Sequence, residues 1–417
     1  MHTTPAVSSP QRPLSGIRVV SLEQYMAGPY CTMLLGDAGA EIIKIERPVT
    51  GDPRRSMPPF AERGGVTKAA GFMAYNRNKK SVALDFRGAQ GQAVLRRLAE
   101  RCDVLVDNLR PGALERAGFD YELLKALNPR LVYAAISGFG RLPDRRGPYS
   151  DRPAFDIVAE AMSGIMHLVG FEDKPPAWTI YGMADIYSGL VTAYGIMQAL
   201  FMRERTGEGQ MVDSAMYDNM LSLNESMVTL HSVAGQSPHR GRPRNAYPRG
   251  AFAAQDGYVA VNVPDDRIWG RWCELMGRAD LTDDSRSCDG TARSQHRDYL
   301  DPIIERWFAT LTRDQAVEQL NAAGVPAGAV HTAEDVFACP QVAARGMLMP
   351  VDDPEVGTFR FARTPPHLSA AVELPASAAP ALGQHTGEIL KELLGFSEAE
   401  VDRLAAAGVV TLSASRG

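Results

Sequence analysis

Residues 17–46 read IRVVSLEQYMAGPYCTMLLGDAGAEIIKIE, and this stretch decides the fold. Ile17–Leu22 is short and rich in β-branched residues, as a buried strand is. A Gly-Pro break at residues 27–29 is followed by a helix-like run that a glycine ends at Gly39. Glu41–Glu46 then predicts a second strand of the same kind. The stretch therefore predicts a compact β-α-β unit.

The same alternation of strand and helix continues along the chain. Strands are predicted at Ser81–Phe86, Val104–Val106 and Leu131–Ile136, and a helix at Gly91–Arg101. Strands that alternate with helices pair in parallel and carry helices on both faces of the sheet. The fold class is therefore α/β, with a large doubly wound, Rossmann-like domain.

The rest of the chain predicts a smaller domain and a return to the first. Ile186–Met202 is apolar almost all round and predicts a buried helix. Residues 235–250 are rich in Gly, Pro and Arg, as a loop is, and residues 331–383 read as an extended return segment. The expected division is a flexible tail at 1–13, a large domain at 14–222, a linker at 223–245, a small α+β domain at 246–330, and a return segment at 331–417 with C-terminal helices that pack on the large domain.

Composition and charge narrow the class of protein. The chain has 417 residues, 45% of them hydrophobic, and a formal net charge of −5, which argues against a nucleic-acid binder. Its five cysteines include no CxxC pair, as expected of reduced thiols in a cytosolic protein. The first residues lack the basic and apolar regions of a signal peptide, and no stretch approaches the roughly 18 apolar residues of a membrane span. We therefore expect a cytoplasmic protein that binds neither nucleic acid nor membrane.

The common cofactor and metal motifs are missing from the sequence. The first β-α turn is not GxGxxG, and the chain contains no P-loop, no HExxH and no GxSxG. Its eight histidines show no metal-ligand spacing. We expect no metal site and no permanently bound cofactor. A nicotinamide oxidoreductase with a variant dinucleotide site stays open on fold analogy alone.

Basic residues instead gather around the predicted strand ends. Arg47 follows the second strand, Arg110 and Arg116 follow the fourth, and Asn78 and Lys79 precede the third. Ligands of open α/β sheets bind beyond the carboxyl ends of the strands, and a cluster of cations there suits phosphate groups. Taken singly, each residue also fits a solvated surface charge. Their repetition at matching positions favours an anionic ligand.

A family resemblance runs through nearly the whole chain after the tail. It is carried by PLSGIRVVSLEQYMAGPYCTMLLGDAGAEIIKIERPVTGDPRR, NRNKKSVALDF, DVLVDNLRPGALERAGFDYELLKALNPRLVYAAISGFG, GMADIYSGLVTAYGIMQALFMRERTGEGQMVDSAMYD, AGVPAGAV, PQVAARGML and APALGQHTGEILKELLGFSEAEVDRLAAAGVV, in this order. These stretches resemble family III coenzyme-A transferases, the CaiB/BaiF type. The resemblance implies coenzyme A as a substrate and an interlocked homodimer, in which each chain threads through a ring made by the other.

The resemblance places the residue that carries the acyl group at Asp185, in ADIYSG, ahead of the long apolar helix. A carboxylate can attack a thioester, form an anhydride and then hold coenzyme A itself as a thioester. The implied reaction moves coenzyme A from an acyl-CoA donor to a free carboxylic acid. By its position Asp185 also fits an N-cap of the helix from Ile186, and the two roles are compatible.

The resemblance also implies contacts with coenzyme A, position by position. The adenosine and phosphate contacts fall on Arg47, Asn78, Lys79 and Arg116, and Met26 and Ala27 lie near the thioester end. One departure is Ser137, because some members carry lysine there. Another is HRGRPRNAYPRG, an arginine-rich segment where oxalate-using members have a glycine-rich loop, which argues against oxalate.

Two alternatives share this fold. An α-methylacyl-CoA racemase needs a second acid/base, a histidine about thirty residues upstream of the aspartate. Here Phe155 stands at that position, followed by Asp156, and phenylalanine cannot exchange a proton. A non-catalytic acyl-CoA-binding protein is the other alternative, and the retention of Asp185 argues against it.

The acid substrates are indicated only by the loop at 235–250. It contains Arg240, Arg242, Arg244 and Arg249. Guanidinium groups bind carboxylates with two hydrogen bonds, so these arginines favour a short dicarboxylate acceptor, with succinyl-CoA as the donor. The same composition also fits a solvated linker.

Overall fold

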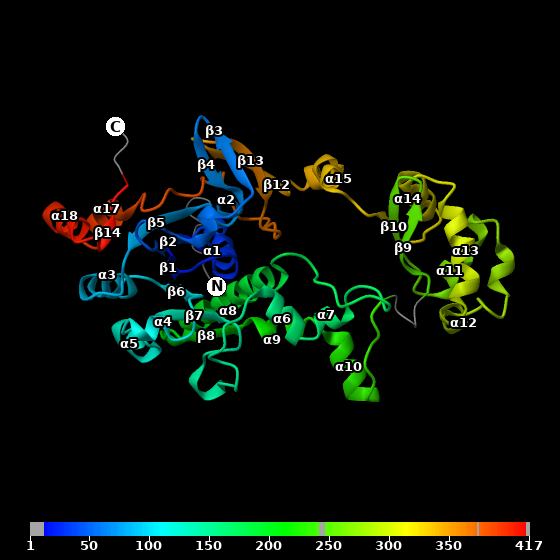
Figure 1. Ribbon diagram of the computed structural model, residues 1–417, viewed down its shortest axis with the longest axis horizontal. Coiled ribbons are helices and arrows are strands. Elements are labelled where there is room, and N and C mark those ends of the chain that lie inside the picture. Colours follow the sequence, from blue (N-terminus) through cyan, green and yellow to red (C-terminus); the bar gives the residue numbers. More distant parts are fainter. Residues whose placement is uncertain (1–11, 242–246, 373–374, 414–417) are drawn as a thin grey trace, which may run out of the picture. The chain divides into compact units, whose positions relative to one another are not determined.

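The computed structural model describes residues 12–241, 247–372 and 375–413, which form two compact units (Figure 1). The large unit comprises the described residues of Met1–His167, Trp178–Gln236 and Gly346–Gly417. The small unit comprises those of Leu168–Ala177 and Ser237–Arg345. Each unit has its own hydrophobic core. The tail expected at 1–13 falls almost wholly outside the described residues.

A seven-stranded sheet forms the centre of the large unit, in the order β14-β5-β2-β1-β6-β7-β8. Its parallel strands are β1 (Arg18–Leu22), β2 (Glu41–Glu46), β5 (Lys79–Leu84), β6 (Val104–Asp107), β7 (Val132–Ser137) and β8 (Met211–Ala215), and β14 (Val410–Thr411) pairs antiparallel with β5. The predicted parallel sheet is confirmed, with strand ends shifted by a residue or two. The strand order reverses between β1 and β6, and ligands of such sheets bind beyond the carboxyl ends at that point.

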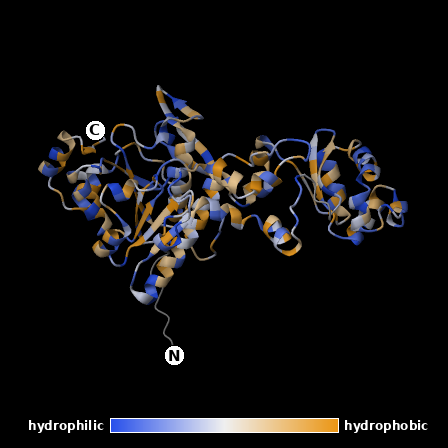
Figure 2. Ribbon diagram, turned by 60° about the horizontal axis from the view of Figure 1, so that its bottom comes forward, coloured by the Kyte–Doolittle hydropathy of each residue, from blue (hydrophilic) through white to orange (hydrophobic). Residues whose placement is uncertain are grey.

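Helices cover both faces of this sheet (Figure 1). One face carries α1 (Ala27–Asp37) and α8 (Met183–Thr206), packed on strand residues such as Val19 and Val106. The elements on the other face are α3 (Ala89–Ala99), α5 (Tyr121–Leu127), η4 (Ile389–Leu393) and α18 (Glu398–Ala406). The C-terminal segment therefore returns to the large unit and closes its core. The apolar strands between the two helical layers appear orange in Figure 2.

The prediction that the apolar helix is buried all round is wrong for one side of α8. Its small residues, such as Gly189 and Ala193, are buried against α1 and the sheet. Its large apolar residues Leu190, Tyr194 and Phe201 are exposed. Apolar residues on all sides of a helix do not reveal which side is buried, whereas small residues mark where another helix can approach closely.

The expected return segment at 331–383 is not extended throughout. It contains α15 (Ala333–Ala338), α16 (Pro340–Ala344) and a hairpin of β12 (Leu348–Asp353) and β13 (Gly357–Ala362). Val356, at the turn of the hairpin, packs with α2 (Ala70–Asn76) in a separate small core. Lys68 Nζ adds an ion pair with Asp353 at 2.7 Å. Buried and exposed residues alternate along β12 of the hairpin, as in a strand with one buried face. In the sequence, the many Pro and Gly residues around the hairpin conceal this short pattern.

The small unit is an α+β arrangement around a three-stranded antiparallel sheet. Its elements are β9 (Arg249–Ala254), β10 (Gly257–Asn262), β11 (Ala327–Ala329), α11 (Asp266–Leu275), η3 (Ala279–Thr282), α12 (Gly290–Gln295), α13 (Arg297–Phe308) and α14 (Arg313–Ala322). Trp269, Trp272 and Phe308 lie at the centre of its core.

Short elements complete the large unit. They are η1 (Pro53–Ser56), β3 (Phe60–Arg63), β4 (Val66–Ala69), α4 (Ala113–Arg116), η2 (Pro143–Arg145), α6 (Asp156–Met162), α9 (Met216–Ser222), α10 (Glu225–Ala234) and α17 (Thr386–Glu388), with α7 (Ile165–Leu168) at its border. Helix α10 occupies much of the expected linker at 223–245. Within the described ranges, no helix combines the length and apolar character needed to cross a membrane.

Candidate active site

A cavity of about 770 Å³ opens at the carboxyl ends of the parallel strands. Its walls include Glu23 and Gln24 after β1, Arg47 after β2, Asp85 after β5, Asn108 after β6 and Gly138 after β7. The Asn108 side chain joins the loops after β1 and β6, because it accepts a hydrogen bond from Gln24 N and donates one to Gln24 O, both at 2.8 Å. The cavity therefore lies at the point where the strand order reverses.

Asp185 lines this cavity from the first turn of α8. Met26 and Ala27, at the N-terminus of α1, line it beside Asp185. The two helices cross closely because Gly189 has no side chain, and a Cβ at this position would lie 2.6 Å from Ala27 O. The structure thus brings together three residues that the sequence analysis assigned to the thioester end.

The N-cap residue of α8 is Gly182, and the side chain that caps the helix is that of Asp156 rather than that of Asp185. Helix α8 begins at Met183, so Asp185 lies inside its first turn. The Asp156 carboxylate, from α6, accepts hydrogen bonds from Ala184 N at 2.6 Å and from Asp185 N at 3.2 Å. It therefore satisfies the free N–H groups of α8. The Asp185 carboxylate accepts no hydrogen bond from the part of the chain that the structure describes, and it remains available for chemistry.

The surroundings of Asp185 make its ionisation difficult. Burial raises the pKa of Asp185 to about 7, and the neighbouring charge of Asp156 acts in the same direction. The guanidinium of Arg54 opposes both effects. A carboxylate with a raised pKa is a stronger base and nucleophile than an exposed one, and perturbed groups of this kind gather at functional sites.

Arginines surround the outer part of the cavity. Arg47, Arg110 and Arg116 line it, are exposed, and form no ion pair with any described residue. Arg87 also lines it, but its guanidinium is paired with Asp85 at 2.7 Å. Three unpaired guanidinium groups beside one cavity suit a ligand with several phosphate groups.

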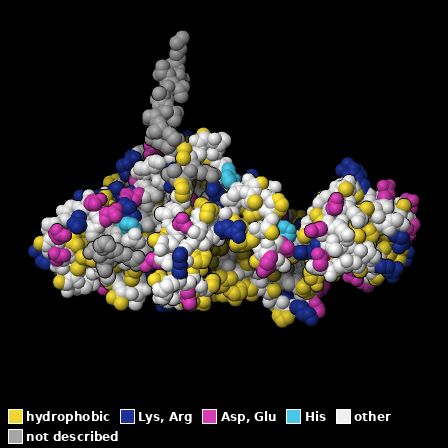
Figure 3. Space-filling model, turned by 90° about the horizontal axis from the view of Figure 1, so that it is seen from above, with side chains coloured by type: hydrophobic (Ala, Val, Ile, Leu, Met, Phe, Trp, Pro, Cys, Tyr) yellow, Lys and Arg dark blue, Asp and Glu magenta, His cyan; other side chains and the backbone are white. Residues whose placement is uncertain are grey.

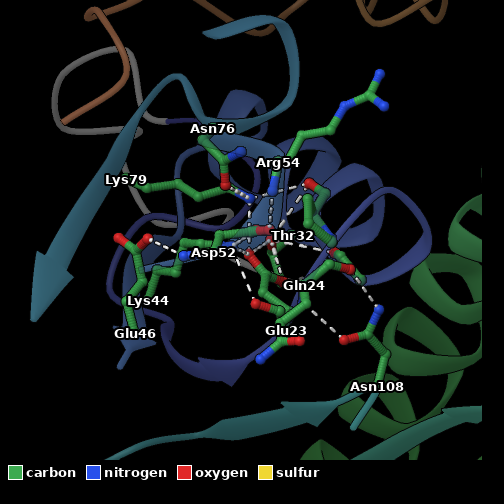
Figure 4. A network of polar contacts seen from close by, with 12 residues as sticks. Glu23, Gln24, Thr32, Lys44, Glu46, Asp52, Arg54, Asn76, Lys79 and Asn108 are labelled. Atoms are coloured by element: carbon green, nitrogen blue, oxygen red, sulfur yellow. Dashed lines mark hydrogen bonds and ion pairs between the residues drawn. The ribbon is translucent and has the colours of Figure 1, made fainter. Parts of the chain in front are cut away.

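Lys79, unlike Arg47 and Arg116, is not among the described residues that line the cavity. Its ammonium group is buried and donates to Glu23 Oε1 at 2.8 Å, to Pro29 O at 3.0 Å and to Asn76 Oδ1 at 3.1 Å (Figure 4). Burial lowers the pKa of Lys79 to about 8, while the charge of Glu23 acts in the opposite direction. The ammonium group of Lys79 is therefore hydrogen-bonded inside the fold, whereas the sequence analysis expects it to contact a phosphate of coenzyme A.

Asn78 is likewise used by the fold. It has a positive φ of 60°, donates from Nδ2 to Asp37 Oδ1 at 2.8 Å, and accepts at Oδ1 from Ser377 N at 2.8 Å. It is absent from the described cavity lining. Both Asn78 and Lys79 lie at the amino end of β5, whereas the cavity lies at the carboxyl ends.

Two departures noted in the sequence both face the cavity. Ser137 lines it and its hydroxyl accepts a hydrogen bond from Gly140 N at 2.9 Å. Phe155 lines it with 58% of its surface exposed, and its ring meets Tyr25 edge-on at 6.0 Å. No histidine is among the described residues of the cavity wall, so the second base of a racemase has no counterpart there.

The described residues of the arginine-rich loop from Ser237 onwards belong to the small unit. Arg242 and Arg244 fall outside the described residues. Arg240 donates a hydrogen bond to Lys174 O, and Arg249 begins β9.

Comparisons with known proteins agree with the family resemblance. The sequence model described as CoA-transferase family III matches residues 14–386. The succinyl-CoA–D-citramalate CoA-transferase of Chloroflexus aurantiacus is 36% identical, over 96% of this chain and 99% of that protein. The succinyl-CoA:mesaconate CoA-transferase of Haloarcula hispanica is 38% identical, over 91% of this chain and 96% of that protein.

The fold of the chain agrees with that of a solved structure of this family. The crystal structure of a CaiB/BaiF family protein from Brucella suis superposes with a TM-score of 0.82 at 37% identity, covering 92% of this chain and 100% of that one. The chain therefore belongs to CoA-transferase family III, as the resemblance of its sequence indicates.

Proposed function

We propose that this transferase moves coenzyme A from succinyl-CoA to a free dicarboxylic acid, with Asp185 as the carrier of the acyl group. The observation that carries the proposal is the Asp185 carboxylate, partly buried at the cavity wall with a raised pKa and no hydrogen bond from the described residues. The named substrates of the relatives, succinyl-CoA with citramalate or mesaconate, support the choice of donor and acceptor class.

The proposed reaction has four steps that together consume no other reagent. The Asp185 carboxylate attacks the thioester carbonyl, the C–S bond breaks, and a mixed anhydride and the coenzyme-A thiolate form. The thiolate attacks the Asp185 carbonyl, which releases the donor acid and leaves an aspartyl-CoA thioester. The acceptor carboxylate attacks this thioester, the C–S bond breaks, and a second mixed anhydride and the coenzyme-A thiolate form. The thiolate then attacks the acceptor carbonyl, which yields the new acyl-CoA and restores Asp185.

The N-terminus of α1 supports this chemistry by its position. Met26 and Ala27 start the helix, and no side chain caps its first N–H groups. Free N–H groups at a helix N-terminus stabilise negative charge on a nearby oxygen. In the proposed mechanism they stabilise the oxyanion that forms at each attack on a carbonyl.

The alternatives fit the site less well. A racemase needs a second acid/base at the cavity, but Phe155 occupies that position and Asp156 is engaged with α8. In a protein that only binds acyl-CoA, nothing would favour keeping Asp185 in surroundings that raise its pKa. Membership of the transferase family removes the basis for a nicotinamide oxidoreductase, which rested on fold analogy alone.

The direct test is a screen of acceptors with purified protein and succinyl-CoA. Mass spectrometry should detect a new acyl-CoA with one or more short dicarboxylic acids and release of succinate in equal amount. Transfer only to monocarboxylic acids would contradict the proposed acceptor class. Racemisation of a 2-methylacyl-CoA without transfer would contradict the reaction.

The same assay tests the phosphate contacts. Arg47→Ala and Arg116→Ala should each raise the KM for succinyl-CoA about 10-fold with little change in kcat, because a phosphate contact is equally strong in the ground and transition states. Arg63→Ala, an exposed arginine of β3, serves as the control. An unchanged KM in both Arg47→Ala and Arg116→Ala would mean that the coenzyme-A phosphates bind elsewhere.

We propose an interlocked homodimer, as the family resemblance implies. Support comes from Leu190, Tyr194, Met197 and Phe201, which form an exposed apolar stripe along α8. Figure 3 shows hydrophobic side chains gathered near the middle of the lower edge of one face. Large exposed apolar surfaces usually mark a contact with another chain.

Interlocked chains cannot separate without partial unfolding. Sedimentation should therefore show one species of twice the chain mass, unchanged on dilution. Two pools with different tags should not exchange subunits over hours. Mixing within minutes, or a native monomer, would exclude the interlocked arrangement and leave the proposed reaction unaffected.

The five free thiols suit a reducing compartment, and we propose that the protein lies in the cytoplasm.

A further inference from the structure

Arg54 is a buried cation beside the active site. It lies in η1, where Asp52 caps the short helix by accepting from Arg54 N at 2.9 Å. Only 8% of its surface is exposed. Its side chain leaves the polar network around Glu23 and Lys79, and its guanidinium points away from that network (Figure 4). Unlike Arg55, which is paired with Glu46 at 2.8 Å, it has no ion pair among the described residues.

The guanidinium of Arg54 is held in place but left incompletely bonded. Its Nη1 donates to Tyr181 Oη at 2.9 Å, and its Nε is buried with no partner in the described structure. A Cβ on Gly71 would lie 2.6 Å from Nη2 and 2.7 Å from Nε, so the missing side chain at Gly71 leaves room for the guanidinium in this position. A buried cation without an anion is unfavourable, which indicates that an anion from outside the fold completes the site.

Tyr181 offers a second donor to such an anion. Because its oxygen accepts from Arg54, its own O–H is free to donate to a ligand. Tyr181 is 55% exposed, so a ligand can reach the hydroxyl. One charged and one neutral donor side by side match the two oxygens of a carboxylate.

The pair lies at the start of α8, because Arg54 donates to Tyr181 Oη at 2.9 Å and Tyr181 precedes Asp185 by four residues. The charge of Arg54 lowers the pKa of Asp185, although the two groups form no ion pair in the described structure. Pro53, the residue before Arg54, lines the cavity together with Asp185. Arg54 does not belong to the described wall of the coenzyme-A cavity, whereas Asp185 does. Asp185 therefore borders the cavity, and the positive charge of Arg54 lowers its pKa.

We propose that Arg54 and Tyr181 bind the free carboxylate of a dicarboxylic acyl group whose other carboxyl carbon reacts at Asp185. The proposal rests on the proposed transferase function and deepens it, because it assigns the selection of dicarboxylates to named residues of the large unit. Coenzyme A then occupies the arginine-lined cavity, and the acyl chain extends past Asp185 to the guanidinium. A monocarboxylic acyl group of equal length leaves Arg54 without its anion.

The test compares two donors, succinyl-CoA and butyryl-CoA, by kcat/KM with one acceptor. In a ping-pong reaction this constant reports only the donor half of the reaction. Arg54→Met should lower kcat/KM for succinyl-CoA at least about 30-fold, and that for butyryl-CoA less than about 3-fold. Arg54→Lys, which keeps the charge, should recover part of the loss.

Two further variants guard against indirect effects. Tyr181→Phe removes one exposed hydroxyl and should shift the donor preference in the same direction by about 5-fold, so it decides the matter if Arg54→Met is unstable. Arg63→Met, the same replacement at an exposed arginine of β3, should leave the preference unchanged.

Equal losses with both donors would overturn the proposal, because Arg54 would then act only through the charge it places near Asp185. An unchanged preference in both Arg54→Met and Tyr181→Phe would overturn it as well. A wild-type protein that transfers coenzyme A from neither donor would contradict the proposed function itself, and the proposal with it. The three results are distinguishable in one set of assays.

Discussion

Asp185→Asn is expected to lower transfer of coenzyme A by about 10⁴-fold or more, because an amide cannot form the anhydride that carries the acyl group. The replacement keeps the size of the side chain, and the hydrogen bonds of Asp156 to the start of α8 involve only backbone N–H groups. The variant should therefore fold normally and bind acyl-CoA. Asp144→Asn, which changes an exposed aspartate of η2, is the matched control. Substantial turnover in Asp185→Asn, measured with succinyl-CoA, would refute the mechanism.

The same variant should be more stable than the wild-type protein above neutral pH. Folding raises the pKa of Asp185 from 3.8 to about 7, so the ionised carboxylate destabilises the folded state progressively as pH rises above 3.8. The effect is complete above pH 7, where it amounts to about 4 kcal/mol at most. Asp185→Asn should therefore raise the free energy of unfolding at pH 8, and the gain should shrink as pH falls towards 4. Acylation of the wild-type protein should decline below pH 7 as Asp185 takes up a proton.

Lys79→Met is expected to destabilise the large unit by about 3 kcal/mol, because it leaves the buried Glu23 with a single, more distant cation. Lys79 Nζ lies 2.8 Å from Glu23 and Lys44 Nζ lies 3.6 Å from it, and all three side chains are inaccessible to solvent. Burial by itself would raise the pKa of Glu23, but the charges of Lys79 and Lys44 hold it below its usual value. Chemical denaturation measures the change in the free energy of unfolding.

The neighbouring lysine provides the control. Lys80 forms partly exposed pairs with Glu41 at 3.0 Å and with Glu388 at 2.7 Å, and Lys80→Met should cost less than about 1 kcal/mol. The folded fraction of Lys79→Met should keep the wild-type KM for succinyl-CoA. A stable Lys79→Met protein with a raised KM would return Lys79 to the coenzyme-A site.

The contrast between Lys79 and Arg47 shows where reasoning from the sequence stops. Both are basic, and both lie in stretches that match the family. Arg47 follows the carboxyl end of β2, where ligands bind, whereas Lys79 opens β5 at its amino end. The strand positions were predictable from their β-branched runs. The direction of the Lys79 side chain, towards Glu23 and Pro29, depends on tertiary packing that no local pattern encodes.

Asp156 and Arg54 are two residues of the site that the sequence did not reveal. Asp156 follows Phe155 in the sequence, but its capping of α8 joins segments far apart in the chain. Arg54 and Arg55 are adjacent and chemically identical, yet only Arg55 has a carboxylate partner in the described structure. The prediction for Asp185 rested on the family resemblance of ADIYSG, and the structure places this residue in the cavity wall.

The covalent role of Asp185 is the central claim, and trapping the aspartyl-CoA thioester is the most direct measurement. The protein is incubated with succinyl-CoA in the absence of acceptor, quenched in acid, digested and analysed by mass spectrometry. Coenzyme A should be found on the peptide that contains Asp185 and on no other peptide, and the adduct should disappear when a dicarboxylic acid is added. An adduct on a different residue, or turnover without any adduct on Asp185, would contradict the account.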